Sequence, residues 1–224
     1  MASSSTHQDI NVAQIAADIV CEFLEVAFHQ ILYIRQVYPA GIFQRRRKYN
    51  IPVQMSCHPD VNQYLQDTLQ TIRPLVGRGE VDKVVLNITD KQASPLERFV
   101  FEVAPPVQPS VSDDSYLIRL EQALRAFVLK INVCDSMLDT LPQDVTFSIH
   151  VYTQDSAAAS LEQQQLVQNF PWVEADSDSL RMPNARIIPL KTMTSNVIKN
   201  SITQHNTDIN IVNYQGTYIS ASYD

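Results

Sequence analysis

Apolar residues recur at three- and four-residue steps in the first part of the chain, which is the period of an amphipathic α-helix. The pattern predicts a long helix over about residues 11–37, with Asn11 as its N-cap and Pro39 shortly after its end. The apolar positions in this period are Val12, Ile15, Ile19, Phe23, Ala27, Ile31 and Ile34. A second apolar row follows at Val20, Leu24, Phe28 and Leu32. Because two rows cover a wide face, we expect this helix to be buried on most sides.

Shorter elements follow up to residue 152. Alternating apolar residues predict a hairpin over residues 42–56, with its turn near Tyr49 and Asn50. Helical periods predict a second helix over about residues 60–76 and a third over about residues 116–138. Strands are expected over residues 83–89, 97–103 and 145–152. Together these elements predict an α+β fold, a compact body of three helices against a sheet.

The pattern changes after Tyr152. Residues 153–169 are polar and rich in Ala, Ser and Gln, and no long helical period organises residues 170–224. The second stretch contains short extended pieces at residues 170–173, 186–193 and 209–219. A tail of this length is either disordered or wraps around something. Its Trp, Ile and Tyr content favours wrapping.

Composition and charge limit the number of domains and the kinds of partner that the chain can bind. The 224 residues suffice for one large domain or two small ones, and an apolar content of 45% suits an ordinary packed core. A formal net charge of −7 provides no overall field that attracts nucleic acid, so we expect no direct binding to DNA. The clearest basic run, residues 45–48, is short. We interpret it as the solvated edge of a hairpin in preference to a phosphate contact.

The cysteines and the N-terminus indicate an intracellular protein. The three cysteines form no Cys-x-x-Cys pair, and Cys21 and Cys134 fall among apolar helix positions, which favours a reducing compartment. The first residues lack the basic-then-apolar pattern of a secretory signal. No stretch approaches the roughly 20 apolar residues of a membrane span, so we expect no membrane contact.

No motif predicts catalysis or cofactor binding. Only four glycines are present, and neither a dinucleotide-binding nor a phosphate-binding glycine pattern occurs. The five histidines show no pairing at helical spacing. Cys57 and His58 are neighbours, but adjacent strand residues point to opposite faces and could not easily share a proton. We expect no enzymatic activity, no cofactor and no metal, with a small hydrolase built on Cys57 and His58 as the alternative.

Several runs of residues resemble a known family. They are residues 21–27 (CEFLEVA), 38–43 (YPAGIF), 48–59 (KYNIPVQMSCHP), 170–172 (FPW) and 188–195 (IPLKTMTS). With these runs in one register over about residues 8–199, the chain resembles HORMA-domain proteins. Within that family it is similar to the mitotic-arrest-deficient-like accessory subunits of translesion DNA polymerase zeta.

The resemblance implies three helices packed on a mostly antiparallel sheet, with a mobile C-terminal segment called the safety belt. The belt closes over a partner peptide, which adds as a strand to the sheet edge. On this basis, residues 1–10 are a flexible N-terminus and residues 11–152 the HORMA core. Residues 153–224 are then the hinge and safety belt of the same domain.

The resemblance also implies roles for individual side chains in binding partners. The family's peptide-gripping aromatics match Tyr64 and Trp172, with Tyr38 as a third. The alternative for Tyr64 is a boundary aromatic of its helix, and for Trp172 it is a structural role. A docking face for the C-terminal domain of the translesion scaffold polymerase matches Ile187, Pro189 and Lys191.

A second surface is implied for dimerisation between HORMA domains. The family uses an Arg on the third helix, matched here by Arg125, and a Lys whose place is taken by Arg45. Arg125 lies beside the apolar row of its helix, so a structural ion pair with its stem packed down is the alternative.

The partners that the resemblance implies are proteins of DNA repair. They are the catalytic subunit of DNA polymerase zeta, a translesion scaffold polymerase, shieldin-type repair factors, an AAA+ ATPase that remodels HORMA domains, and a second HORMA domain. The implied function is a non-catalytic adaptor in the DNA damage response and in cell-cycle control, in the nucleus and also in the cytoplasm. The alternative within the fold is a spindle-checkpoint protein that inhibits the anaphase-promoting complex.

Overall fold

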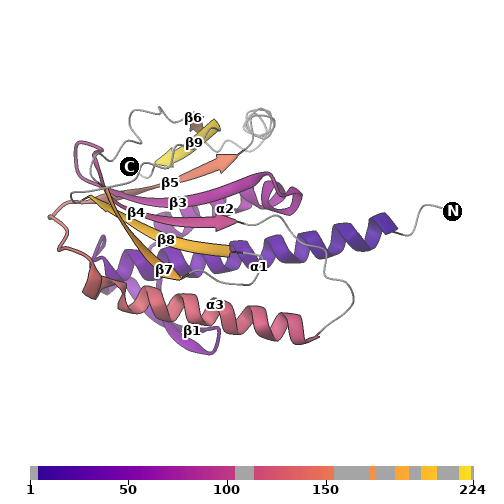
Figure 1. Ribbon diagram of the computed structural model, residues 1–224. Coiled ribbons are helices and arrows are strands. Elements are labelled where there is room, and N and C mark those ends of the chain that lie inside the picture. Colours follow the sequence, from indigo (N-terminus) through magenta and orange to yellow (C-terminus); the bar gives the residue numbers. More distant parts are fainter. Residues whose placement is uncertain are drawn as a thin grey trace.

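The computed structural model describes residues 5–103, 114–153, 172–174, 185–191, 198–205 and 217–222 (Figure 1). The helices of this described part are α1 (Ser5–Ile34), α2 (Pro59–Arg78) and α3 (Asp114–Cys134). Short 3₁₀ turns follow α1 and α3, namely η1 (Ala40–Ile42) and η2 (Asp135–Met137). Helix α1 packs against both α2 and α3. The α+β class and the three predicted helices are confirmed.

An antiparallel sheet lies against the helices, and its seven strands within the described residues follow the order β6-β9-β5-β3-β4-β8-β7 (Figure 1). Its central strands come from the body of the chain and are β5 (Thr146–Thr153), β3 (Val81–Thr89) and β4 (Pro95–Val103). Its outer strands come from the tail and are β6 (Val173–Glu174), β9 (Thr217–Ser222), β8 (Ile198–His205) and β7 (Ala185–Lys191). The tail therefore wraps the body by adding strands to both edges of its sheet.

Helix α1 differs from its predicted bounds at both ends. The expected start at Asn11 is wrong: residues 5–34 contain neither Gly nor Pro, and the helix extends back to Ser5, into the segment predicted as a flexible N-terminus. The helix ends at Ile34, earlier than expected, because Gln36 adopts a left-handed conformation with φ of 54°. A left-handed residue at this place is a common way to end a helix.

The predicted hairpin is confirmed as β1 (Phe43–Lys48) and β2 (Ile51–Ser56). Its turn residues Tyr49 and Asn50 have φ values of 48° and 57°, as a two-residue turn between twisted strands requires. The hairpin is attached to α1 through His29, whose Nδ1 accepts a hydrogen bond from the Ser56 amide at 3.2 Å. His29 is 2% exposed, so this bond is shielded from water.

Phe23 in α1 joins several elements of the core. Its ring lies 6.1 Å from that of Phe101 in β4 and 5.8 Å from that of Phe127 in α3, measured between centroids. It also lies 6.4 Å from the Tyr49 ring at the hairpin turn. The three phenylalanines are at most 1% exposed. Contacts with the sheet, the third helix and the hairpin confirm that α1 is buried on most sides.

A buried ion pair ties the end of α1 to the sheet. Arg35 donates through Nε and Nη2 to the two carboxylate oxygens of Glu97 in β4, at 2.9 and 2.7 Å. It also donates to the Asp135 carboxylate and to the Asp139 carbonyl, just beyond α3. Glu97 is 1% exposed, and a carboxylate in such a place needs a charged, hydrogen-bonded partner. Arg35 therefore connects α1, the sheet and the end of α3.

The tail strands match the sequence prediction only in part. The extended piece predicted at residues 186–193 corresponds to β7, and the one at residues 209–219 is described only from Thr217 onwards, in β9. Strand β8 was not predicted, because few of its residues are apolar and it forms by pairing with β4. The predicted hinge, residues 153–169, lies outside the described residues apart from Thr153.

Candidate peptide-binding site

At one edge of the central sheet, a single strand separates β5 from β6. The chain leaves β5 at Thr153 and returns at Val173 as β6, and β9 lies between these two strands. On one side Ile219 of β9 pairs with Val151, and on the other Ser220 pairs with Val173. An extended segment in this place pairs its backbone with strands on both sides. We call this space between β5 and β6 the strand slot.

Three aromatic rings from three separate segments meet beside the strand slot. The ring of Phe147 in β5 packs edge-on against Tyr64 of α2 at a centroid distance of 5.5 Å. It packs in the same way against Tyr38, which follows α1, at 6.1 Å. The structure thus brings together two of the residues predicted to grip a peptide. They meet through Phe147, which lies in the strand predicted over residues 145–152.

The hydroxyl of Tyr64 reaches the backbone of β5. It accepts a hydrogen bond from the Ile149 amide at 3.3 Å. Burial raises the pKa of Tyr64, so the phenol stays protonated and can both donate and accept. Ile149 pairs with Ala221 of β9. Tyr64 therefore contacts β5 at a residue that also pairs with the strand in the slot.

Trp172 lies just before β6 and is docked on α2. Its Nε1 donates to the Thr71 hydroxyl at 3.0 Å, and the side chain is 6% exposed. Tyr64, Thr68 and Thr71 follow one face of α2 at helical spacing, so the sites of Tyr64 and Trp172 lie two turns apart on that face. Trp172 thereby fastens β6, the outer wall of the slot, to the body. Thr71 was missed, because a helical threonine carries no signal for a partner 101 positions away.

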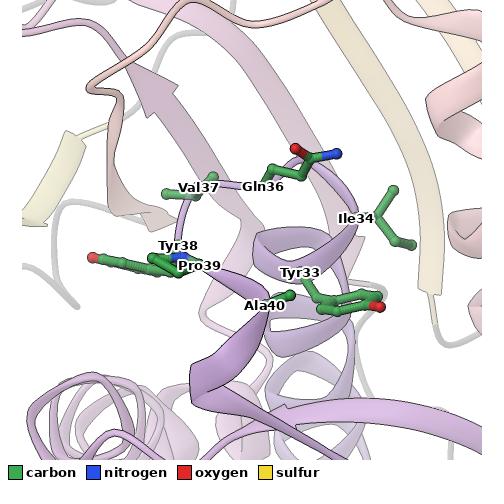
Figure 2. A pocket seen from close by; sticks show the side chains of 7 residues that line it. All are labelled: Tyr33, Ile34, Gln36, Val37, Tyr38, Pro39 and Ala40. Atoms are coloured by element: carbon green, nitrogen blue, oxygen red, sulfur yellow. The ribbon is translucent and has the colours of Figure 1, made fainter.

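A cleft of about 540 Å³ lies at the loop after α1. Its lining residues are Tyr33, Ile34, Gln36, Val37, Tyr38, Pro39 and Ala40. Figure 2 shows the Tyr38 ring beside Pro39 on one side of the loop, with Tyr33 on the other. The lining is mixed, with apolar and aromatic side chains beside the Gln36 amide. Tyr38 belongs both to this cleft and to the aromatic cluster on Phe147.

The side of β5 that carries His150 is polar. The Asn87 amide lies 3.0 Å from the imidazole, and the Ser148 hydroxyl lies 3.2 Å from Nε2. Burial lowers the pKa of His150 to about 4, and the positive charge of Arg98 acts in the same direction. At neutral pH the ring is therefore uncharged. The His150 residue stands opposite Ser220 of β9, the strand in the slot.

The residues predicted for a second partner lie at the other edge of the sheet. Ile187, Pro189 and Lys191 belong to β7, at the opposite end of the strand order from the slot. Ile188, between the first two of these residues, is 7% exposed. A register shift between Ile188 and Lys191 interrupts the pairing of β7 with β8. The structure thus separates these residues from the aromatics that were predicted to grip a peptide.

The residues predicted for dimerisation lie on α3 and β1. Arg125 and Arg45 are both exposed, and no salt bridge between described residues involves either. Beyond Arg125 the outer face of α3 carries the exposed apolar side chains Leu129 and Val133, and Met137 in the following turn η2 is also exposed. An exposed apolar row next to a free cation is typical of a contact surface.

Other candidate chemistry finds little support. Cys57 is exposed, whereas His58 Nδ1 is buried without a hydrogen-bond partner, so the two do not form a hydrogen-bonded pair. Within the basic run, Lys48 forms a salt bridge with Glu22 at 2.8 Å, as at a solvated hairpin edge. No group of three or more metal-ligating side chains occurs among the described residues. No helix within them is long and apolar enough to cross a membrane.

Comparisons with known proteins agree with this geometry. The HORMA domain family matches residues 16–164. Human mitotic spindle assembly checkpoint protein MAD2B is 54% identical over 194 residues, which cover 87% of this chain and 92% of the relative. DNA polymerase zeta subunit 2 of Drosophila melanogaster is 31% identical over 163 residues, covering 72% of this chain and 82% of that protein.

Solved structures share the fold. A chain in the crystal structure of the mitotic checkpoint complex superposes with a TM-score of 0.70 at 24% identity, covering 84% of this chain and 97% of that one. C. elegans HTP-2 bound to the HIM-3 closure motif gives a TM-score of 0.62 at 13% identity, with coverages of 85% and 90%. Together with the family match, these similarities show that the chain belongs to the HORMA domain family.

Proposed function

We propose that this protein is a non-catalytic adaptor that clasps extended, proline-bearing segments of DNA-repair proteins and serves as an accessory subunit of translesion DNA polymerase zeta. The observation that carries the proposal is the strand slot, one strand wide and closed on its outer side by β6. An extended segment that adds to a sheet edge gains main-chain hydrogen bonds, while side-chain pockets select its sequence.

The aromatic residues beside the slot suit prolines. Tyr38, Tyr64 and Trp172 all lie next to β5 or β6, and the cleft at Tyr38 adds the aromatic ring of Tyr33. Proline is already fixed at its backbone and loses little entropy when a ring stacks on it. Because β6 must move before the slot opens, release is slow, and a long residence time suits an accessory subunit.

The names of relatives favour the polymerase role. The Drosophila relative is named DNA polymerase zeta subunit 2, and an Arabidopsis thaliana relative is named DNA polymerase zeta processivity subunit. The partner proposed for the slot is therefore the polymerase catalytic subunit, with shieldin-type factors as further ligands. The scaffold polymerase docks at Ile187, Pro189 and Lys191, a second HORMA domain docks at Arg125 and Arg45, and an AAA+ ATPase reopens the belt. The proposed location is the nucleus and also the cytoplasm.

The test is a calorimetric titration with a proline-bearing peptide of the polymerase catalytic subunit. The wild type is compared with Tyr64→Ala and Trp172→Ala, and with Ile118→Ala as a control at an exposed apolar position on α3. We expect tight binding by the wild type and the control, and loss of most binding in the other two. Equal affinity of Trp172→Ala and the wild type would contradict the proposal.

A second candidate function is inhibition of the anaphase-promoting complex. The vertebrate relatives carry the name mitotic spindle assembly checkpoint protein, which favours it. A peptide panel separates the two functions, since the polymerase ligands contain spaced prolines and the checkpoint ligands lack them. Preference for the proline-free set would favour the checkpoint function.

A further inference from the structure

The strand slot holds a segment of this same chain. Strand β9 pairs with β5 through six residue pairs, from Thr217 opposite Thr153 to Ser222 opposite Ser148. On its other side it pairs with β6 at Val173 and Glu174. The chain's own strand β9 therefore occupies the slot and pairs with the strands on both sides of it.

The residue pattern of β9 matches that of β5. Ile219 and Ala221 stand opposite Val151 and Ile149, and both of those β5 residues are 0% exposed. The alternate position Ser220 stands opposite His150 on the polar side. Because a slip of one residue would exchange the two faces, apolar residues opposite apolar ones fix this register. The strand lies beyond residue 164, where the match to the HORMA domain family ends.

We propose that β9 is the resident ligand of the strand slot and that a partner segment binds by displacing it. The proposal rests on the proposed function in one respect, namely that the slot is where the partner segment binds. It adds that the slot of the ligand-free protein is already occupied by β9, in which apolar residues alternate with hydroxyl residues from Tyr218 to Ser222. The slot therefore recognises this pattern in addition to proline-bearing partner segments.

The linkage of β9 to the body makes it a strong competitor. Residues 206–216 join the end of β8 to β9, and a short connection gives a tethered ligand an effective concentration of about a millimolar. A partner peptide binds only the fraction of molecules whose slot is empty, so its apparent affinity falls by that fraction. Removing β9 should then tighten partner binding by about ten-fold or more.

The test compares four proteins. They are the full chain, a chain that ends at Gly216 and lacks β9, a control that ends at Ser222 and keeps it, and the full-length variant Ile219→Asp. The aspartate places a charge opposite buried Val151 and weakens β9 without shortening the chain. Two probes are used, a fluorescein-labelled peptide of residues 213–224 and a proline-bearing peptide of the polymerase catalytic subunit.

We expect the labelled tail peptide to bind the chain that ends at Gly216 and to bind the full chain and the Ser222 control at least about ten-fold more weakly. The proline-bearing peptide should compete with it, and should bind the Gly216 chain and Ile219→Asp about ten-fold more tightly than the full chain.

Two results overturn the proposal. One is failure of the tail peptide to bind the Gly216 chain, and the other is equal affinity of all four proteins for the proline-bearing peptide. If the tail peptide binds but none of the four proteins binds the proline-bearing peptide, the resident ligand is supported and the proposed function is contradicted.

Discussion

The indole nitrogen of Trp172 donates a hydrogen bond to the hydroxyl of Thr71 at 3.0 Å, across 101 positions of the sequence. Through this bond the start of β6 is fastened to α2, and β6 forms the outer wall of the strand slot. Because Trp172 is the single tryptophan of the chain, tryptophan fluorescence reports on the surroundings of this one side chain.

Replacing Thr71 by valine should loosen the tail without unfolding the body. The substitution leaves the buried indole N–H without its acceptor, which typically costs about 1–3 kcal/mol. We expect a red shift of Trp172 emission and easier quenching by iodide, with an unchanged circular dichroism spectrum. Thr68→Val on the same helix face is the control, since the Thr68 hydroxyl bonds the Tyr64 carbonyl and not Trp172. Identical emission of the two variants would contradict this anchoring role.

The hydroxyl and the ring of Tyr64 should contribute separately to peptide binding. Tyr64→Phe keeps the edge-on contact with Phe147 and loses the hydrogen bond from the Ile149 amide. A net hydrogen bond is worth about 1 kcal/mol, so we expect the affinity for a proline-bearing peptide to fall about five-fold. Tyr64→Ala also removes the ring and should lose most binding. Titration of both variants checks this, and equal affinities of Tyr64→Phe and Tyr64→Ala would show that the ring contributes nothing.

Breaking the buried ion pair should be strongly destabilising. Arg35→Met leaves the Glu97 carboxylate, 1% exposed, without its bidentate partner. Loss of one member of such a pair costs about 3–5 kcal/mol, whereas apolar replacement of both is much milder. Urea unfolding of Arg35→Met, Glu97→Met and the double variant measures this. A double variant less stable than either single one would refute the interpretation.

Stability should fall as the solution is acidified from neutral pH. Burial lowers the pKa of His29 from 6.5 to about 4, so between these values the unfolded chain binds a proton that the folded chain does not. The stabilisation is present above pH 6.5 and is lost as the pH falls towards 4, by up to about 3 kcal/mol. Protonation also removes the Nδ1 acceptor of the Ser56 amide. Urea unfolding at several pH values should show a smaller loss for His29→Asn than for the wild type, and parallel pH profiles would argue against this role.

The outer face of α3 should mediate self-association. Arg125 is exposed and is followed by exposed Leu129 and Val133. If this face joins two HORMA domains, Arg125→Ala should shift the equilibrium towards monomers while leaving the melting temperature within a degree or two of the wild type. Sedimentation velocity over a range of concentrations measures the shift. A monomeric wild type at every concentration would remove Arg125 from this role.

The body of the fold follows from local patterns, whereas the arrangement of the tail does not. Helical periods and the turn at Tyr49 and Asn50 predicted the elements up to residue 152, because each depends on neighbours in the sequence. The start of α1 was misplaced because Asn11 can cap a helix but nothing before it interrupts one.

The site required information that is distant in the sequence. Tyr64 and Trp172 were named through resemblance alone, and only the structure joins them to Phe147 and Thr71. The place of β9 depends on pairing with β5, about 70 positions earlier, and no periodicity within a short strand encodes a partner so far away. Sequence patterns therefore predicted a wrapping tail without predicting what it encloses.

Hydrogen exchange of the strand-slot amides with and without a saturating proline-bearing peptide tests the central claim most directly. If the peptide pairs with β5 in the slot, the amides of residues 217–222 lose protection, while those of residues 146–153 remain protected by the new strand. If the peptide binds but the protection of residues 217–222 is unchanged and new protection appears at β7 or α3, the strand slot is not the peptide site.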